Sequence, residues 1–374
     1  MKVLFLTNIP SPYRVDFFNE LGLLCDLTVT FEGTYATDRD SKWKCDEIKN
    51  FTPLFMRGVR INSDSFFCPK IIKIIKQKWD VIVVGVYSSI TSMLAIEYMR
   101  RKKIPFYIEA DGGLIYPDKK LKYNIKKHFI SSASGWLSSG LMTDKYFIHY
   151  GADEDNIYRY HFTSLKKNDI KLLHPLNCTE KQYYRQKLGI KESRVVISVG
   201  RFISLKGFDV LIKASEKIDS DIGVYIVGGN PTEEYLNIIK EYNLHNIHFI
   251  GFMSKPELEE YYMAADMFAL PTRSDVWGLV INEAMACALP VITTDRCVAG
   301  MDLIVDEHNG YIIPVDDIEL LAKKINIIAN DDDLRNKMAE NNLNKIKEYT
   351  IEKMAESHFE IFKKIIDKYV EDKK

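Results

Sequence analysis

The chain alternates short apolar runs with amphipathic stretches, and it does so in two successive series. Short runs rich in β-branched residues are typical of strands buried in a parallel sheet. In the first series such strands are predicted at 1–8, 25–31, 80–85, 104–108 and 136–139. Helices are predicted between them at 16–24, 70–78, 91–102 and 119–132. Strands that alternate with helices form parallel sheets covered on both faces, so the pattern predicts an α/β, doubly wound fold.

The alternation stops and starts again near Pro175, which indicates two domains. The second series begins at the strand 195–200 and continues to the strand 289–294, and a long helix is predicted over 350–369. With 374 residues the chain has room for two domains of ordinary size. We therefore predict three parts: 1–175, 176–349 and a C-terminal segment, 350–374.

Composition and charge indicate a soluble globular protein with two electrically different halves. Hydrophobic residues make up 46% and charged residues 28%, and no run reaches the roughly 18 apolar residues of a membrane span. We therefore expect a cytoplasmic location. Residues 1–173 hold 26 Lys and Arg and 19 Asp and Glu, a balance of +7, whereas the remaining residues hold 25 and 33, a balance of −8. A basic half suggests that one domain faces an anionic surface.

The segment 271–292 carries the clearest chemistry. A loop containing Asp275 leads through Gly278 into an apolar helix that contains Leu279 and Glu283. Glycine lets backbone approach a ligand closely, and the N–H groups at a helix start bind anions. Strand, loop, glycine, helix and strand is the arrangement that a phosphate site needs. This pattern fits a nucleotide diphosphate, with a protein carboxylate on either side of it to bind sugar hydroxyls.

This segment resembles the signature of retaining, nucleotide-sugar-dependent glycosyltransferases with the GT-B architecture, glycosyltransferase family 4. That family shows Glu, seven residues and Glu around Gly-Phe-Gly; here Asp275 holds the first position and Val276-Trp277-Gly278 the middle. The resemblance implies two Rossmann-like domains facing a cleft, the first for the acceptor and the second for the nucleotide sugar. It also implies that the C-terminal helix returns to the first domain.

A second motif, Gly200-Arg201 followed by Lys206-Gly207, resembles the Gly-Arg and Lys-Gly signature of the same family. The resemblance implies that Arg201 and Lys206 grip the donor diphosphate and stabilise charge on the leaving group. The segment 251–258 resembles the base-recognition loop of the family, which implies that backbone near Phe252 reads the edge of the base; the alternative is an ordinary turn between a strand and a helix.

By the same resemblance, Asp275 would contact the sugar hydroxyls, backbone at Gly278 and Leu279 the phosphate, and Glu283 the ribose. The expected donor is a nucleotide-diphosphate sugar, with UDP favoured, and no metal or other cofactor is implied. Two aspartate clusters, 38–40 and 331–333, lie in polar segments remote from the motifs, and solvated charge explains them.

The first domain offers three candidate residues. Arg14 follows the opening strand in a loop with prolines and no glycine, where it is expected to supply charge to the phosphate. Glu109 and Asp111 follow another strand, where family members place a catalytic histidine. Two carboxylates there are expected either to stabilise oxocarbenium-like charge or to orient the acceptor hydroxyl; the alternative is an ordinary turn.

Residues 119–127 predict a basic amphipathic helix, in which Leu121, Ile125 and Phe129 form one stripe. Such a helix suits an anionic membrane, although a surface helix whose stripe faces the core has the same pattern. Its cations are Lys119, Lys120, Lys122, Lys126 and Lys127. Basic residues interleaved with aromatic ones are absent, so nucleic acid is not an expected partner.

The segment 8–14 also resembles a branch of this family found in bacterial surface-polysaccharide assembly. The resemblance implies a hexosyltransferase of such assembly, for example of O-antigen or capsule, acting on a glycan or polyprenyl-diphosphate-linked acceptor. Two alternatives remain open. One is a nucleotide-sugar epimerase of the same fold, which turns over its substrate without an acceptor. The other is a non-catalytic partner subunit, which binds a donor without turnover.

Overall fold

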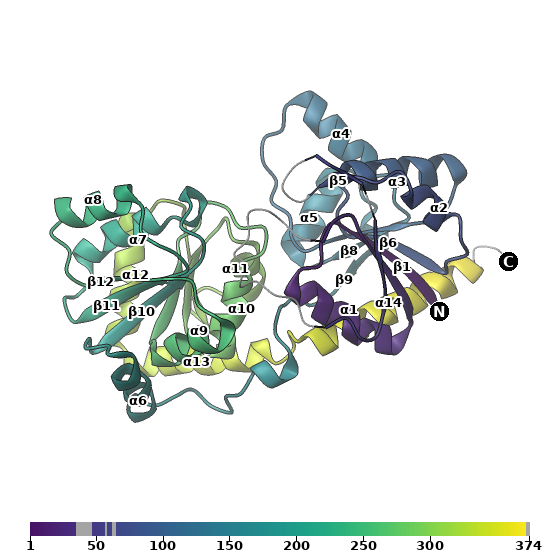
Figure 1. Ribbon diagram of the computed structural model, residues 1–374. Coiled ribbons are helices and arrows are strands. Elements are labelled where there is room, and N and C mark those ends of the chain that lie inside the picture. Colours follow the sequence, from purple (N-terminus) through teal and green to yellow (C-terminus); the bar gives the residue numbers. More distant parts are fainter. Residues whose placement is uncertain (35–46, 57, 62–64, 372–374) are drawn as a thin grey trace. The chain divides into compact units, whose positions relative to one another are not determined.

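A computed structural model describes residues 1–34, 47–56, 58–61 and 65–371 of the chain. The chain divides into two compact units, one formed by residues 1–166 with 349–374 and the other by 167–348 (Figure 1). Each unit is a parallel sheet covered by helices, so the predicted α/β class with two doubly wound domains is confirmed.

The sheet of the first unit has the order β3-β2-β1-β6-β7-β8-β9, and all of its strand pairs are parallel. The central strands are buried apolar runs, as their composition predicts. The strands are β1 (Lys2–Thr7), β2 (Asp26–Phe31), β3 (Thr52–Phe55), β6 (Val81–Val84), β7 (Tyr107–Ala110), β8 (Gly135–Ser138) and β9 (Ile157–Arg159). Beside this sheet lies a short antiparallel pair, β4 (Val59–Arg60) and β5 (Phe66–Phe67).

Helices cover both faces of this sheet. One face packs against α1 (Pro12–Leu24) and α14 (Ile351–Glu371), which contact each other along their length. The other face carries α2 (Ile71–Ile75), α3 (Ile90–Lys102), α4 (Lys120–Ile130) and α5 (Leu141–His149), and the 3-10 turn η1 (Glu154–Asn156) precedes β9. The predicted return of the C-terminal helix to the first unit is therefore confirmed.

The boundary between the units lies before residue 167, earlier in the chain than the prediction at 175. Two ion pairs explain this difference. Asp169, in the 3-10 turn η2 (Lys167–Asp169), pairs with Lys255 at 2.6 Å, and Lys171 pairs with Glu259 at 2.7 Å. Because both partners belong to α9 (Lys255–Ala264), the segment after 166 is tied to the second unit.

The second unit has a sheet of order β12-β11-β10-β13-β14-β15, again with parallel pairs throughout. The chain runs outward from β10 to β12 and then returns to continue on the other side at β13, so the topological switch lies between β10 and β13. Ligands of open α/β sheets bind at such a switch, beyond the carboxyl ends of the strands. The strands are β10 (Arg194–Val199), β11 (Ile222–Val227), β12 (Ile247–Ile250), β13 (Met267–Leu270), β14 (Val291–Thr294) and β15 (Gly310–Ile313).

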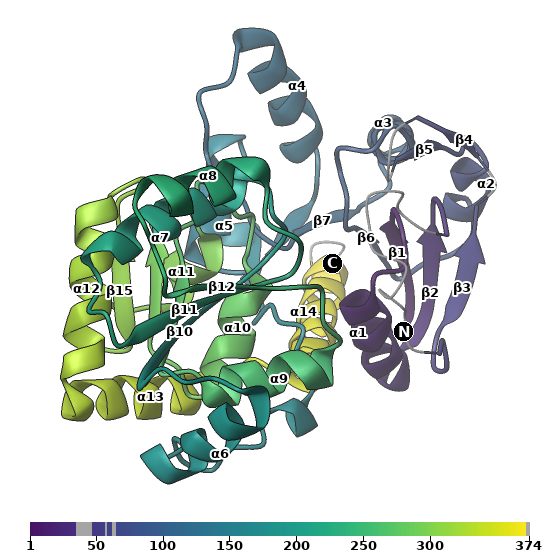
Figure 2. The same cartoon turned by 60° about the vertical axis from the view of Figure 1, so that its left-hand side comes forward.

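The helices of the second unit also lie on two faces, as the two views in Figures 1 and 2 show. One face carries α7 (Phe208–Ala214), α8 (Glu233–Glu241) and α12 (Ile318–Asn330). The other carries α9, α10 (Leu279–Ala286) and α13 (Asp332–Ile346). The remaining elements are α6 (Cys178–Leu188), α11 (Val298–Leu303), η3 (Ser204–Lys206) and η4 (Ser215–Lys217).

No helix in the described part of the chain has both the length and the apolar character that crossing a bilayer requires.

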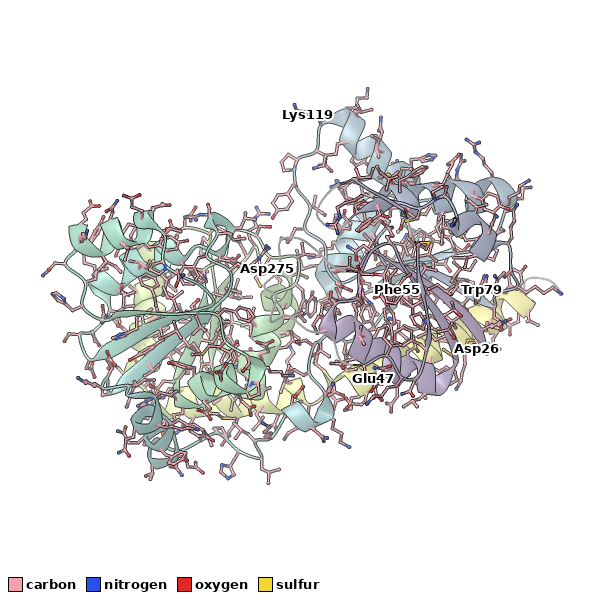
Figure 3. The ribbon with its side chains drawn as sticks, in the orientation of Figure 1. Asp26, Glu47, Phe55, Trp79, Lys119 and Asp275 are labelled. Carbon is pink, nitrogen blue, oxygen red and sulfur yellow. The ribbon has the colours of Figure 1, made fainter. Side chains whose placement is uncertain are left out.

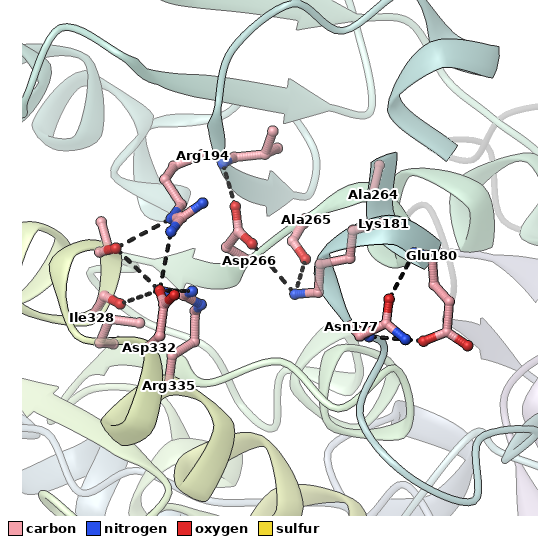
Figure 4. Close-up of polar contacts among 12 residues, drawn as sticks. Asn177, Glu180, Lys181, Arg194, Ala264, Ala265, Asp266, Ile328, Asp332 and Arg335 are labelled. Carbon is pink, nitrogen blue, oxygen red and sulfur yellow. Dashed lines mark hydrogen bonds and ion pairs between the residues drawn. The ribbon is translucent and has the colours of Figure 1, made fainter. Parts of the chain in front are cut away.

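Asp266, directly before β13, is the centre of a buried charge network in the second unit (Figure 4). Its carboxylate accepts from the backbone N–H of Val195 at 2.8 Å and pairs with Arg185 at 2.6 Å and with Lys181 at 3.4 Å. Burial lowers the pKa of Lys181 against the opposing charge of Asp266. The network ties α6 to the amino end of the sheet.

Replacement of Arg185 by Met should destabilise the second unit by about 3 kcal/mol, because the buried Asp266 carboxylate then keeps only the more distant Lys181 as a cationic partner. Arg194 offers a matched control, since its partner Asp332 has a side chain that is 59% exposed. Arg194→Met should cost less than about 1 kcal/mol. Hydrogen exchange of the amides of β10 measures both values, and equal effects would show that Asp266 does not depend on Arg185.

Candidate functional site

The loop after β10 places Arg201 and Lys206, the two cations of the Gly-Arg and Lys-Gly motif, at the carboxyl edge of the second sheet. Gly207 adopts a φ of 66°, and a Cβ on it would lie 2.0 Å from the backbone oxygen of Pro271. Only glycine therefore lets this loop close against the end of β13. The loop leaves Arg201 exposed and lays the Lys206 side chain along Gly200.

Lys206 and Asp275, which come from the two separate motifs, form an ion pair. The Lys206 Nζ lies 2.5 Å from the Asp275 Oδ2, and the two side chains are 16% and 15% exposed. An ammonium has three N–H donors, so this contact leaves donors for a second oxygen. The sequence predicted both residues, and the structure brings them together.

The backbone around Asp275 is pinned to the loop after β14. The Asp275 N–H donates to the carbonyl of Arg296 at 2.9 Å, and the Val298 N–H donates to the Asp275 carbonyl at 3.2 Å. Gly278 has a φ of 99°, and a Cβ on it would lie 2.8 Å from the Cys297 Sγ. Asp275 is labelled in Figure 3, where it lies in this part of the second unit.

Helix α10 begins at Leu279, directly after Gly278, as the sequence predicted. The first N–H groups of a helix have no partner within it, so they form a binding site for an anion. Trp277, next to the glycine, is 4% exposed and its indole N–H donates to Asn282 at 2.9 Å. Trp277 therefore supports the start of the helix from inside and does not line the surface.

Glu283 lies one helical turn after Leu279, on the same face of α10. It is half-buried, and one of its oxygens accepts from the hydroxyl of Tyr262 at 3.1 Å. Burial raises the pKa of the Glu283 carboxyl, and Lys255 and the Tyr262 hydroxyl oppose this shift. Tyr262, on α9, carries no sequence signal that would single it out, because it lies inside an ordinary amphipathic helix.

Arg273 is a further residue that sequence reasoning missed. Its guanidinium pairs with Asp209 at 2.6 Å and with Asp316 at 2.7 Å, and it donates to the carbonyl of Ser204 at 2.7 Å. The Asp209 hydrogen bond and charge raise the pKa of Arg273. Arg273 thus fastens the turn that carries Lys206 to the start of α7.

Phe252 lies in the loop after β12, at the same sheet edge, and is 41% exposed. By contrast, Phe202 packs into the core against Phe208 and Phe249. The exposed Phe252 is thus placed where a ligand at this edge reaches it, and its role toward a base stays a prediction.

Arg14, Glu109 and Asp111 lie together in the first unit, in an arrangement that differs from the prediction. Arg14 is 4% exposed, and its guanidinium donates to both carboxylates. In this arrangement Arg14 is enclosed against two carboxylates and does not face a phosphate, which differs from the expectation. Glu109 is 1% exposed, which removes it from contact with a substrate.

Asp111 is the one carboxylate of this group that reaches the surface, with a side chain that is 23% exposed. The Tyr13 hydroxyl donates to its Oδ2 at 3.1 Å. Partial burial raises the pKa of Asp111 against the opposing charge of Arg14, whereas Arg14 and His358 outweigh burial and lower the pKa of Glu109.

The aspartate clusters serve other purposes where the structure describes them. Asp331 caps α13 and Asp332 pairs with Arg335. The cluster at 38–40 lies outside the described residues. Within the described ranges, no group of three or more His, Cys, Asp or Glu side chains is arranged to hold a metal ion.

Comparison with known proteins finds relatives of the second unit. Residues 180–345 match the family model described as glycosyl transferases group 1. The O-antigen biosynthesis glycosyltransferase WclY of Escherichia coli is 30% identical over 188 residues, which is 48% of this chain and 51% of the relative. A D-inositol 3-phosphate glycosyltransferase of Corynebacterium glutamicum is 32% identical over 205 residues, 51% and 48% of the two chains. The chain thus spans about half the length of these curated relatives.

Solved structures show the same fold over nearly the whole chain. Anabaena Alr3699/HepE in complex with UDP and glucose has a TM-score of 0.73 at 17% identity, covering 99% of this chain and 100% of that one. WaaG, a glycosyltransferase involved in lipopolysaccharide biosynthesis, has a TM-score of 0.67 at 17% identity, covering 96% and 99%. Residues 180–345 therefore match the family model of the group 1 glycosyltransferases, and the chain as a whole has the GT-B fold.

Proposed function

We propose that this protein is a retaining glycosyltransferase that moves a sugar from a nucleotide-diphosphate sugar to a glycan or lipid-linked acceptor. The observation that carries the proposal is the Lys206–Asp275 pair beside the start of α10. At this sheet edge the cation can bind one phosphate of such a donor and the helix N-terminus the other phosphate. The carboxylate can accept hydrogen bonds from the sugar hydroxyls.

In this proposal the second unit holds the donor. Arg201 and Lys206 bind the diphosphate, and the N–H groups at Gly278 and Leu279 bind its other oxygens. Glu283 accepts hydrogen bonds from the ribose. Asp275, already held through its backbone, contacts the hydroxyls of the transferred sugar.

The same groups assist departure of the nucleotide. Charge grows on the leaving diphosphate in the transition state, and preorganised cations lower the barrier most when they meet that charge. As the bond between the sugar and the phosphate breaks, the acceptor hydroxyl attacks on the face that the nucleotide leaves and gives its proton to the departing phosphate oxygen. Attack on this face retains the configuration of the sugar. Because two cations and a helix N-terminus balance the phosphates, the proposed reaction requires no divalent ion.

A UDP-sugar is the favoured donor. Support comes from the structural neighbour HepE, whose structures contain UDP, UDP and glucose, or UDP-glucose. The relatives WclY and WaaG, named for O-antigen and lipopolysaccharide biosynthesis, support a role in surface-polysaccharide assembly.

Helix α4 supports a lipid-linked acceptor at a membrane surface. Leu121 is 74% and Ile125 42% exposed, so this part of the apolar stripe does not face the core. An apolar groove of about 300 Å³, with Leu121, Ile125 and Phe129 in its wall, runs between α4 and the start of α3. Lys119 is labelled at the outer end of α4 in Figure 3, and Lys122 and Lys126 line the groove.

One lysine of the predicted membrane set has a different role. The Lys126 ammonium lies 2.8 Å from Asp118 and 3.0 Å from the hydroxyl of Tyr150, and its side chain is 20% exposed. Lys126 is therefore part of the packing of α4. Lys122 also pairs with Asp118, at 3.0 Å, but its side chain is 66% exposed. The proposed membrane surface therefore consists of the exposed Lys119, Lys120, Lys122 and Lys127.

Replacement of Lys206 or Arg201 by Ala should reduce kcat/KM for a UDP-sugar about 100-fold, because each removes a preorganised charge partner of the leaving group. The measurement is UDP release with a membrane lipid extract as the source of acceptor. Lys217→Ala is the control, since Lys217 is exposed on η4 and pairs with Glu319. Near-wild-type rates in both site variants, or complete loss of activity in excess EDTA, would refute this part of the proposal.

Nucleotide binding should weaken as the pH falls from about 7 to 5. A raised pKa means that Glu283 takes up its proton at a higher pH than an ordinary glutamate, and a protonated carboxyl accepts poorly from a ribose hydroxyl. Calorimetry with a UDP-sugar, whose diphosphate keeps its charge over this range, should show this loss in the wild type and a weaker affinity with less dependence on pH in Glu283→Gln. An unchanged UDP affinity in Glu283→Ala would show that Glu283 does not hold the ribose.

Binding to anionic vesicles should fall with salt, because charges are screened beyond about 8 Å at physiological ionic strength. Changing Lys119, Lys120, Lys122 and Lys127 to Gln should abolish sedimentation with phosphatidylglycerol vesicles, while Lys73→Gln on α2 leaves it unchanged. Equal sedimentation of the four-lysine variant and the wild type would place any membrane contact elsewhere.

A further inference from the structure

A chain of buried charges connects the C-terminal helix to the surface acid of the first unit. Asp111 accepts from Arg14, Arg14 also donates to Glu109, and Glu109 faces His358 of α14. The side chains of Arg14, Glu109 and His358 are 5%, 0% and 0% exposed. Asp111, at 23%, is the only one of these four with substantial exposure.

Both ring nitrogens of His358 face hydrogen-bond acceptors. The Nδ1 lies 2.8 Å from the backbone carbonyl of Met354, which only accepts, so the Nδ1 carries a proton. The Nε2 lies 3.3 Å from the Glu109 Oε2. Arg14 donates to the other Glu109 oxygen and favours the ionised form of Glu109, so a carboxylate faces the Nε2, which is placed to donate to it.

The positions of the neighbouring groups agree with this assignment. Two cations, Arg14 and His358, then balance two carboxylates, Glu109 and Asp111, as a buried group of charges requires. The other titratable groups at the network are the hydroxyls of Tyr13 and Tyr160; Tyr13 donates to Asp111, and Tyr160 donates toward Glu109 and Asp111.

Aromatic rings hold the imidazole in its orientation. The His358 ring centroid lies 4.7 Å from that of Phe17 and 4.4 Å from that of Tyr160. A ring fixed in this way cannot turn its Nε2 away from Glu109, so the position of α14 controls the charge beside the acid.

We infer that His358 is a positioning residue that acts through Glu109 and Arg14 to hold Asp111 as an ionised hydrogen-bond partner for the acceptor hydroxyl. This inference rests on the proposed transferase function for the role of Asp111, and on geometry alone for the charge network. Asp111 lies at the carboxyl edge of the first sheet, where the resemblance to glycosyltransferases places a histidine that this chain lacks.

The charge network can be tested without measuring enzymatic activity. In protein labelled with ¹⁵N at histidine, the His358 resonances, assigned with His358→Gln, should show both ring nitrogens protonated at pH 7. In protein labelled with ¹³C at the aspartate carboxyl, the Asp111 signal, assigned with Asp111→Asn, should titrate about one pH unit higher in His358→Gln, because a nearby cation has been removed. A neutral imidazole, or an unmoved Asp111 titration, overturns the inference.

A second variant separates positioning from general structural damage. Glu109→Gln combined with His358→Gln removes one charge of each sign, so the Asp111 titration should return close to that of the wild type. His161→Gln is the matched control: this histidine is exposed and stacks on Tyr349 in the same unit. A loss of thermal stability in His358→Gln with no shift in the Asp111 titration shows only a structural role and overturns the inference.

The consequence for transfer follows from the same variants. With membrane lipid extract as acceptor and UDP-glucose as donor, His358→Gln should lower kcat about 10-fold near the acid limb of the pH profile and move that limb about one unit upward. The KM for UDP-glucose should stay unchanged, because the donor groups lie in the second unit. If no UDP-sugar is turned over by the wild type, the proposed function fails, while the two labelling experiments still decide the charge network.

Discussion

The attraction between the Lys206 ammonium and the Asp275 carboxylate holds together the two loops on which the second unit's site depends. These loops follow β10 and β13, the neighbouring strands at which the order of the sheet reverses. Gly207 lets them approach, and Arg273 fastens the turn that bears Lys206. The pair is thus set in place by the fold before any ligand arrives, and preorganisation of this kind is what makes a charged site effective.

The charged groups of the two units have different roles, because they differ in how deeply they are buried. In the second unit Lys206 and Asp275 keep about a sixth of their surface exposed, so their remaining hydrogen-bonding capacity faces outward. In the first unit Arg14 and Glu109 are enclosed, and an enclosed ion needs partners inside the protein. Asp111 is therefore the charged group of this network that reaches the surface, and α14 belongs to the network through His358.

Prediction from the sequence succeeded where a local pattern has a single structural solution. Buried central strands such as β1 and β6 are continuous apolar runs, and Gly278 marks the start of α10. Edge strands such as β3 and β9 escaped prediction because they are short and half-exposed, which leaves no apolar run to detect. The segment after residue 166, which precedes Pro175, belongs to the second compact unit and forms ion pairs with α9.

Short-range patterns at strand and helix ends were enough to predict the fold class and most of the elements, and they singled out Arg201, Lys206, Asp275 and Glu283 as candidate residues. Which charges meet depends on the tertiary structure. Lys206 and Asp275 are 69 positions apart, Arg14 and Glu109 are 95, and Glu109 and His358 are 249. Partners at such separations are chosen by how strands and helices pack, and burial then determines whether a charged side chain faces a ligand or another side chain.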